Sequence, residues 1–299
     1  MKTASLSPTA ATGIAGVRSA REAAAAAIRR AGIEVRTVDD LGELALASEL
    51  WQTIWKRDGE APVSRDLLRA LSHAGNYLAG AFRDGSLIGA LLGFYSGHDR
   101  PDQMHSHILG VNPEARARGV GFALKMHQRA WALEHGLERI TWTFDPLVRN
   151  NAYFNLAKLG TVGAEYLLNF YGAMPDAINT HEDSDRLLVT WDLRTPRAEQ
   201  AAAGSALEID ARTSAAATVA LKSDSSGRPE LTGQSGDIEL CQIPLDIVSL
   251  RQSAPDVARQ WRVALREIMV SAFRGGLVAS GMNREGWYLL APREREDLG

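Results

Sequence analysis

Arg116-Ala117-Arg118-Gly119-Val120-Gly121 is the stretch that decides the fold, because it joins an apolar, strand-like run to a helical run. The first run ends at Val111, and the second begins near Phe122. Backbone N–H groups in the first turn of a helix have no partner inside the helix, and with the helix dipole they attract anions. Glycines at 119 and 121 lack the Cβ atoms that would keep a diphosphate from the backbone, and the arginines add positive charge. The stretch therefore predicts a binding site for a phosphate-bearing ligand.

Spacing alone leaves alternatives open. A glycine-containing loop with solvated arginines has the same pattern, and so has a nucleotide-binding loop. No P-loop lysine follows these glycines in the right place, which disfavours the nucleotide-binding loop.

Apolar periodicity predicts the elements around this stretch. Helices are expected over 41–55, 64–72, 122–133 and 152–159. Strands are expected over 77–82, 87–95, 105–111, 140–144, 166–170 and 187–193. Polar and glycine residues at 83–86 indicate a hairpin between the first two strands. This order predicts a mixed α/β layer architecture.

The stretch from His105 to Glu114, the Arg/Gly segment and the following helix resemble the acetyl-CoA-binding core of the GNAT acyltransferases. That family's signature is Gln or Arg, two residues, Gly, one residue, then Gly or Ala, and here it is Arg116-x-x-Gly119-x-Gly121. The resemblance continues through 150–160, which ends in a Lys-Leu-Gly triplet, and it covers roughly 36–193. Residues 142–147 and Tyr171-Gly172 are similar to a bacterial GNAT subgroup with an additional C-terminal region.

The resemblance implies a GNAT-type mixed central sheet flanked by helices, plus a smaller C-terminal α+β region. It also implies acetyl-CoA or another acyl-CoA as co-substrate, bound between splayed fourth and fifth strands. The residues that would hold this co-substrate are Ile108, Leu109 and Val111 for the pantetheine arm, Arg116, Ala117, Arg118, Gly119, Val120, Gly121, Phe122 and Ala123 for the diphosphate, and Asn150, Asn151 and Phe154 on the next helix. For the two asparagines a plain N-cap role is equally compatible.

Acyl transfer to an amine needs a base, and His105 is the first candidate because imidazole titrates near neutral pH. His107 lies two residues on, on the same side of an extended strand. Both could instead be packed histidines. A metal site at this pair is disfavoured, because no further ligand lies nearby in sequence, and no metal is expected. Asp145, before Pro146, could assist as a base or form a turn.

The residue that would protonate the departing thiolate differs from the family pattern. Many GNAT enzymes have a tyrosine four residues before the helix-ending glycine, and here that residue is Leu156. Tyr153 lies three residues earlier on nearly the same helix face, and Tyr171 follows in the next strand region. The thiolate could also leave unprotonated.

Composition predicts a cytoplasmic protein that binds neither nucleic acid nor membrane. The chain has 299 residues, a net charge of −3 and no basic block. No apolar run is long enough to span a bilayer. The single cysteine, Cys241, excludes an intrachain disulfide and is expected to be a small core residue.

The expected organisation is a flexible N-terminal segment with a short helix (1–34), a GNAT domain (35–194), a linker and loop-rich segment (195–237), and a C-terminal α+β region (238–299). The sequence favours an N-acyltransferase that moves an acyl group from CoA to a primary amine by direct attack in a ternary complex. A non-catalytic acyl-CoA sensor or scaffold is the alternative. A small-molecule amine is a more probable acceptor than a protein, and a homodimer stays open.

Overall fold

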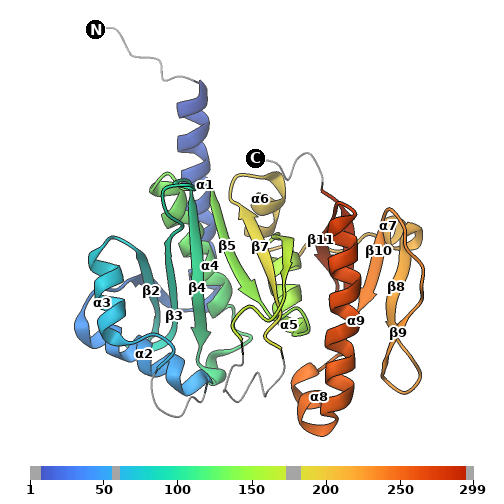
Figure 1. Cartoon of the computed structure of the whole chain (residues 1–299). Coiled ribbons are helices and arrows are strands. Elements are labelled where there is room, and N and C mark those ends of the chain that lie inside the picture. The colour runs from blue at the N-terminus through green and yellow to red at the C-terminus, as the bar shows by residue number, and fades with distance from the viewer. Residues whose placement is uncertain (1–7, 56–60, 173–182, 294–299) are drawn as a thin grey trace. The chain divides into compact units, whose positions relative to one another are not determined.

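The computed structural model describes residues 8–55, 61–172 and 183–293, which form two compact units, 1–140 and 141–299 (Figure 1). The division falls inside strand β5 (Arg139–Phe144). The domain boundary expected after residue 194 lies within the second unit.

The first unit contains an antiparallel sheet in the order β1-β2-β3-β4. Its strands are β1 (Glu34–Thr37), β2 (Tyr77–Arg83), β3 (Ser86–Tyr95) and β4 (Gln103–Val111). Its helices are α1 (Pro8–Ala31), α2 (Leu41–Trp55), α3 (Arg65–His73) and α4 (Val120–Glu134). The helices and strands predicted over 41–133 are confirmed within a few residues, whereas β1 was not predicted.

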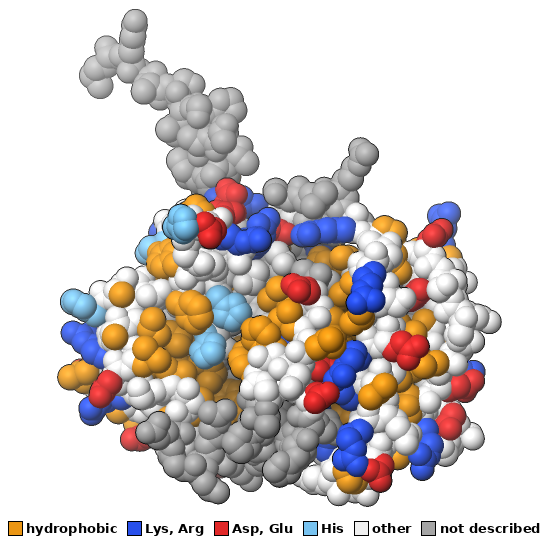
Figure 2. All heavy atoms as spheres, in the orientation of Figure 1, with side chains coloured by type: hydrophobic (Ala, Val, Ile, Leu, Met, Phe, Trp, Pro, Cys, Tyr) orange, Lys and Arg blue, Asp and Glu red, His pale blue; other side chains and the backbone are white. Residues whose placement is uncertain are grey.

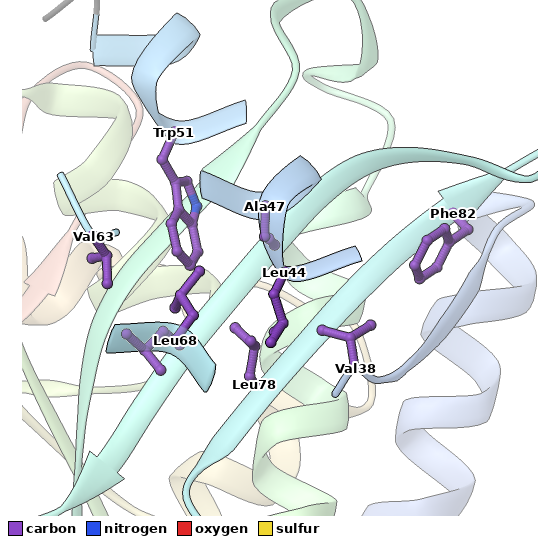
Figure 3. Close-up of a cluster of buried hydrophobic side chains, with 10 residues drawn as sticks. Val38, Leu44, Ala47, Trp51, Val63, Leu68, Leu78 and Phe82 are labelled. Carbon is purple, nitrogen blue, oxygen red and sulfur yellow. The ribbon is translucent and has the colours of Figure 1, made fainter. Parts of the chain in front are cut away.

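Helices α2 and α3 cover one face of this sheet with a hydrophobic core (Figure 3). Leu44, Ala47 and Trp51 recur at helical spacing along α2 and point toward Leu68 and Leu78 (Figure 3). The Trp51 indole lies so close to β4 that a Cβ on Gly110 would be 2.5 Å from its Cδ1 atom. Glycine at 110 therefore lets the helix approach the strand.

Helix α1 is longer than the short helix expected from the sequence. It spans 24 residues and packs against α4 in the same unit. Ala20, Ala24, Ala27 and Ala31 are buried along one face. Alanine favours helix strongly and allows two helices to approach closely, which explains this element.

The second unit contains a mixed sheet in the order β5-β7-β6-β11-β12-β10-β8-β9, in which β8 and β10 are parallel. Its remaining strands are β6 (Val162–Leu167), β7 (Arg186–Asp192), β8 (Thr218–Ser223), β9 (Pro229–Leu231), β10 (Glu239–Gln242), β11 (Leu277–Met282) and β12 (Trp287–Pro292). Its helices are α5 (Arg149–Ala152), continued by a π-helical segment (Tyr153–Lys158), α6 (Pro196–Ala202), α7 (Ala211–Ala216), α8 (Ile247–Ser253) and α9 (Pro255–Arg274).

The segment 195–237 differs from the expected linker, because it contains α6, α7, β8 and β9. Thr195 Oγ1 accepts a hydrogen bond from Ala198 N at 3.3 Å and caps α6. The buried faces consist of small residues such as Ala198 and Ala201, so their composition looked like that of a linker. The amphipathic helix α9 is followed by a hairpin of β11 and β12.

Candidate functional site

The loop between β4 and α4 turns through two residues with a left-handed backbone. Asn112 Oδ1 accepts from Glu114 N at 3.1 Å and starts a short 3-10 turn, Pro113–Ala115. Ala117 and Gly119 then take positive φ angles of 61° and 81°. Alternation of ordinary and left-handed residues turns successive N–H groups toward one side of a loop, which suits an anion.

Gly119 is the N-cap of α4, and no side chain caps this helix. The helix begins with the bond from Ala123 N to Gly119 O, at 2.9 Å. Arg116 and Arg118 are exposed beside this turn, whereas Val120 is buried and fixes its position. The turn thus presents backbone N–H groups and two guanidinium groups to solvent.

His105 and His107 lie next to each other on β4, with ring centroids 6.3 Å apart. Their rings lie 5.4 and 5.8 Å from that of Phe94 on β3. A β-bulge explains the pairing: Leu92 is opposite Ile108 and Gly93 is opposite Ser106, so His107 is the extra residue.

His105 is half-buried, and His107 is exposed. Histidine and hydrophobic side chains gather on the surface seen in Figure 2. Burial, with the charges of His107 and Lys125, lowers the pKa of His105 to about 4, and burial also lowers the pKa of His107. Both imidazoles are therefore neutral at pH 7, and the lowered pKa makes His105 a weaker base than an ordinary histidine.

A buried polar cluster lies on the other face of β4 and was not predicted. Lys125 of α4 is 2% exposed, and its Nζ donates to Ser106 Oγ at 2.8 Å and to Gln128 Oε1 at 3.1 Å. The apolar periodicity that predicted the helix over 122–133 did not indicate that Lys125 and Gln128 are buried. The only sequence signal was a lysine next to that stripe, and such a lysine is normally solvated.

Asp145 is a structural residue, and the structure argues against its expected role as a base. Its carboxylate is 8% exposed and lies 2.6 Å from Arg251 Nη2 and 2.9 Å from Arg262 Nη1. Burial raises the pKa of Asp145, but the charges and hydrogen bonds of Arg262 and Arg251 outweigh burial and hold this pKa below its ordinary value. A carboxylate stabilised in this way is a poor proton acceptor. The sequence could not reveal these partners, because they lie more than 100 residues away.

The two tyrosines expected as acids both lie in the second unit. Tyr153 OH donates to Glu208 Oε1 at 3.3 Å and accepts from Arg284 Nε at 3.1 Å. Tyr171 is 43% exposed, and its hydroxyl lies 3.3 Å from Thr143 Oγ1 on β5. Leu156, at the family's tyrosine position, is fully buried.

Asn150 and Asn151 are exposed in the first turn of α5. The N-cap of α5 is Val148, so neither asparagine has the plain capping role considered from the sequence. Phe154 is half-buried in the following π-helical segment, a kind of irregularity that is frequent at functional sites.

Within residues 8–55, 61–172 and 183–293, no group of three or more His, Cys, Asp or Glu could hold a metal ion. Cys241 is buried as predicted, and burial raises the pKa of its thiol. Across the same described ranges, no helix is long and apolar enough to cross a membrane.

The sequence model of the acetyltransferase (GNAT) family matches residues 44–160, which include β4, the loop after it, α4 and α5. Over this segment the chain is therefore similar to the GNAT family of acetyltransferases. The chain has no match among curated proteins.

Several solved structures match part of this chain at low identity. An N-acetyltransferase from Staphylococcus aureus Mu50 is 14% identical with a TM-score of 0.46, over 54% of this chain and 99% of that one. A phosphinothricin acetyltransferase from Sinorhizobium meliloti, in complex with AcCoA, is 14% identical with a TM-score of 0.45, over 53% and 87%. A GNAT acetyltransferase from Streptococcus pneumoniae is 15% identical with a TM-score of 0.42, over 53% and 97%.

Proposed function

We propose that the chain is an acyl-CoA-dependent N-acyltransferase that moves an acyl group, acetyl in the simplest case, to a primary amine by direct attack in a ternary complex. The observation that carries this proposal is the loop between β4 and α4. It has an uncapped helix start at Gly119 and exposed arginines at 116 and 118, inside the segment that matches the GNAT family.

The residues of this loop fit a CoA diphosphate. The N–H groups of Gly119 to Phe122 would face the phosphates, with Ala123 following them in the first turn of α4, and the guanidinium groups would add charge-assisted hydrogen bonds. A side chain at 119 would need a strained left-handed backbone, so glycine keeps this approach open. Ile108, Leu109 and Val111 would pair through their backbone with the pantetheine arm. Asn150 and Asn151 of α5 and Phe154 of the π-helical segment would also contribute.

The chemistry is a substitution at the thioester carbonyl. The amine nitrogen attacks the carbonyl carbon, the C–N bond forms, the C–S bond breaks and CoA leaves as a thiolate. The amine loses one proton, which His105 accepts directly or through water, with His107 as the neighbouring second candidate. The thiolate leaves unprotonated or takes a proton from Tyr171 or Tyr153.

We prefer Tyr171 as the acid, because the hydroxyl of Tyr153 already donates to Glu208 and accepts from Arg284. The proposed acceptor is a small-molecule amine, and Asp145 takes no part in the reaction.

The proposal is tested first by binding. Acetyl-CoA should raise the melting temperature of the wild-type protein, and Gly121→Glu should abolish this rise because a carboxylate would repel the diphosphate. Ala25→Glu, at an exposed position of α1, is the matched control and should keep the rise. An equal rise of the melting temperature in Gly121→Glu would contradict a diphosphate-binding site in the loop after β4.

Turnover separates the enzyme from the alternative, a non-catalytic acyl-CoA sensor, which the leucine at 156 favours. Acetyl-CoA and a panel of amines should release free thiol and form an amide in equal amounts. His105→Ala should lower kcat by about 10²-fold or more with little change in acyl-CoA affinity. Binding without thiol release from any amine would favour the sensor.

A further inference from the structure

The buried cluster under β4 forms a closed ring of hydrogen bonds. Lys125 Nζ donates to Ser106 Oγ and Gln128 Oε1, and Ser106 Oγ donates to the same Gln128 oxygen at 3.1 Å. Gln128 Nε2 in turn lies 3.6 Å from Met104 Sδ. All four side chains are buried, between 0% and 4% exposed.

This ring holds the residues that flank the two histidines. Ser106 lies between His105 and His107, and Met104 precedes His105. The bulge leaves His107 without a partner on β3, so the ladder alone does not fix its orientation. The side chains of Met104 and Ser106 are anchored on α4, and the two histidine rings lie together against Phe94.

Burying a lysine amine costs more free energy than burying an apolar side chain of similar size. Burial lowers the pKa of Lys125 well below its ordinary value, and an apolar side chain of similar size would avoid this desolvation. Position 125 lies beside an apolar stripe, where methionine or leucine would suit packing. The amine therefore indicates a role that requires its hydrogen bonds.

We propose that Lys125, acting through Ser106 and Gln128, is a positioning residue that fixes the bulged part of β4 and so orients His105 and His107 for proton transfer from the acceptor amine. This inference rests on the proposed function, since it assigns the two histidines to the reaction. Helix α4 then has two roles: its first turn faces the diphosphate, and its next turns hold the strand that carries the bases.

The charge of Lys125 acts on the same imidazole. After burial, the groups whose charges lower the pKa of His105 are His107 on β4 and Lys125 on α4, and the Phe94 ring on β3 packs against the imidazole. Removing the amine should therefore move the pKa of His105 upward from about 4.

The test compares wild type with Lys125→Met, which keeps the length of the side chain and removes its donors. Lys222→Met, at a half-exposed position of β8, is the matched control. The imidazole signals of His105 and His107 are followed by NMR in the ligand-free protein across a pH titration. The kcat and the KM for acetyl-CoA are measured in parallel.

We expect both histidine signals to shift in Lys125→Met and the titration of His105 to move to higher pH. We expect kcat to fall between about ten- and a hundred-fold, with the KM for acetyl-CoA within about twofold of wild type. Lys222→Met should behave as wild type. Histidine signals and titration that coincide with wild type would overturn the proposal, and so would equal losses in kcat and acetyl-CoA affinity.

Ser106→Ala is the second variant, in case Lys125→Met does not fold. It removes one oxygen from the ring and should shift the same imidazole signals, but it keeps the Lys125 amine and so should move the titration of His105 less. If wild type transfers no acyl group, the proposed function fails, but the histidine signals of the variants still show whether the ring fixes the imidazoles.

Discussion

His105 shows at the scale of one residue how position sets chemistry. It is half-buried on β4 against Phe94, and burial together with His107 and Lys125 lowers its pKa to about 4. The imidazole therefore stays neutral over a wide range of pH. A neutral imidazole can accept a proton whenever an amine arrives, although it is a weaker base than an ordinary histidine.

The lowered pKa of His105 predicts how stability depends on pH. Histidine in the unfolded chain titrates near 6.5, so between pH 6.5 and 4 the unfolded state binds more protons than the folded state. The free energy of unfolding should therefore fall as pH is lowered through this window. His105→Asn should reduce this fall in urea titrations, whereas His98→Asn, at a 95% exposed position, should not. Identical pH profiles for wild type and His105→Asn would contradict the lowered pKa.

Substitution of Asp145 should cause a large loss of stability rather than a selective loss of activity. Asp145→Asn leaves Arg251 and Arg262 buried without their counter-charge, which should cost about 3 kcal/mol or more. Asp256→Asn removes an 82% exposed partner of Arg259 and should cost less than about 1 kcal/mol. Chemical denaturation measures both changes. An Asp145→Asn protein with wild-type stability and no turnover would return Asp145 to the role of a base.

At the scale of elements, α1 and α4 form a close helix pair whose contact depends on alanine. Arg21 forms an ion pair with Glu134 at the C-terminal end of α4, and Ala31 lies beside Gly119 at its N-terminal end. The two helices are therefore antiparallel. The end of α1 supports the turn that we propose for the diphosphate.

This packing predicts a contrast between two neighbouring alanines of α1. Ala27→Leu inserts bulk into the buried face and should destabilise the protein by about 1–3 kcal/mol. Ala25→Leu places the same side chain on the exposed face and should change stability little. Thermal unfolding distinguishes them, and equal melting temperatures would mean that α1 does not pack as described.

The sequence predicted those elements whose signals are local. The apolar stripe of α2, the hairpin of β2 and β3, and the glycine loop before α4 each follow from spacing within about ten residues. Segment 195–237 was missed because its alanine-rich helix and short strands resemble a linker in composition. The partners of Asp145 and the ring around Lys125 depend on contacts between distant residues, which periodicity does not reveal.

At the scale of the whole molecule, charge predicts how acyl-CoA binding depends on salt. The chain carries a net charge of −3, so its overall field repels a polyanion and the attraction must come from local groups such as Arg116 and Arg118. The affinity for CoA should fall several-fold between about 0.01 and 0.5 M salt, because exposed charges are screened. Arg116→Ala should flatten this dependence in calorimetric titrations, and Arg212→Ala, on exposed α7, should not. An affinity independent of salt would show that the arginines do not contact the phosphates.

The central claim is that backbone amides at the start of α4 bind the diphosphate of an acyl-CoA. The most direct measurement is amide NMR of the deuterated protein, titrated with CoA and with pantetheine, which has no phosphate. The account predicts large downfield shifts of the Gly119, Val120, Gly121 and Phe122 amide signals with CoA and little change of these signals with pantetheine. Saturable binding of CoA that leaves these four signals in place would contradict the account.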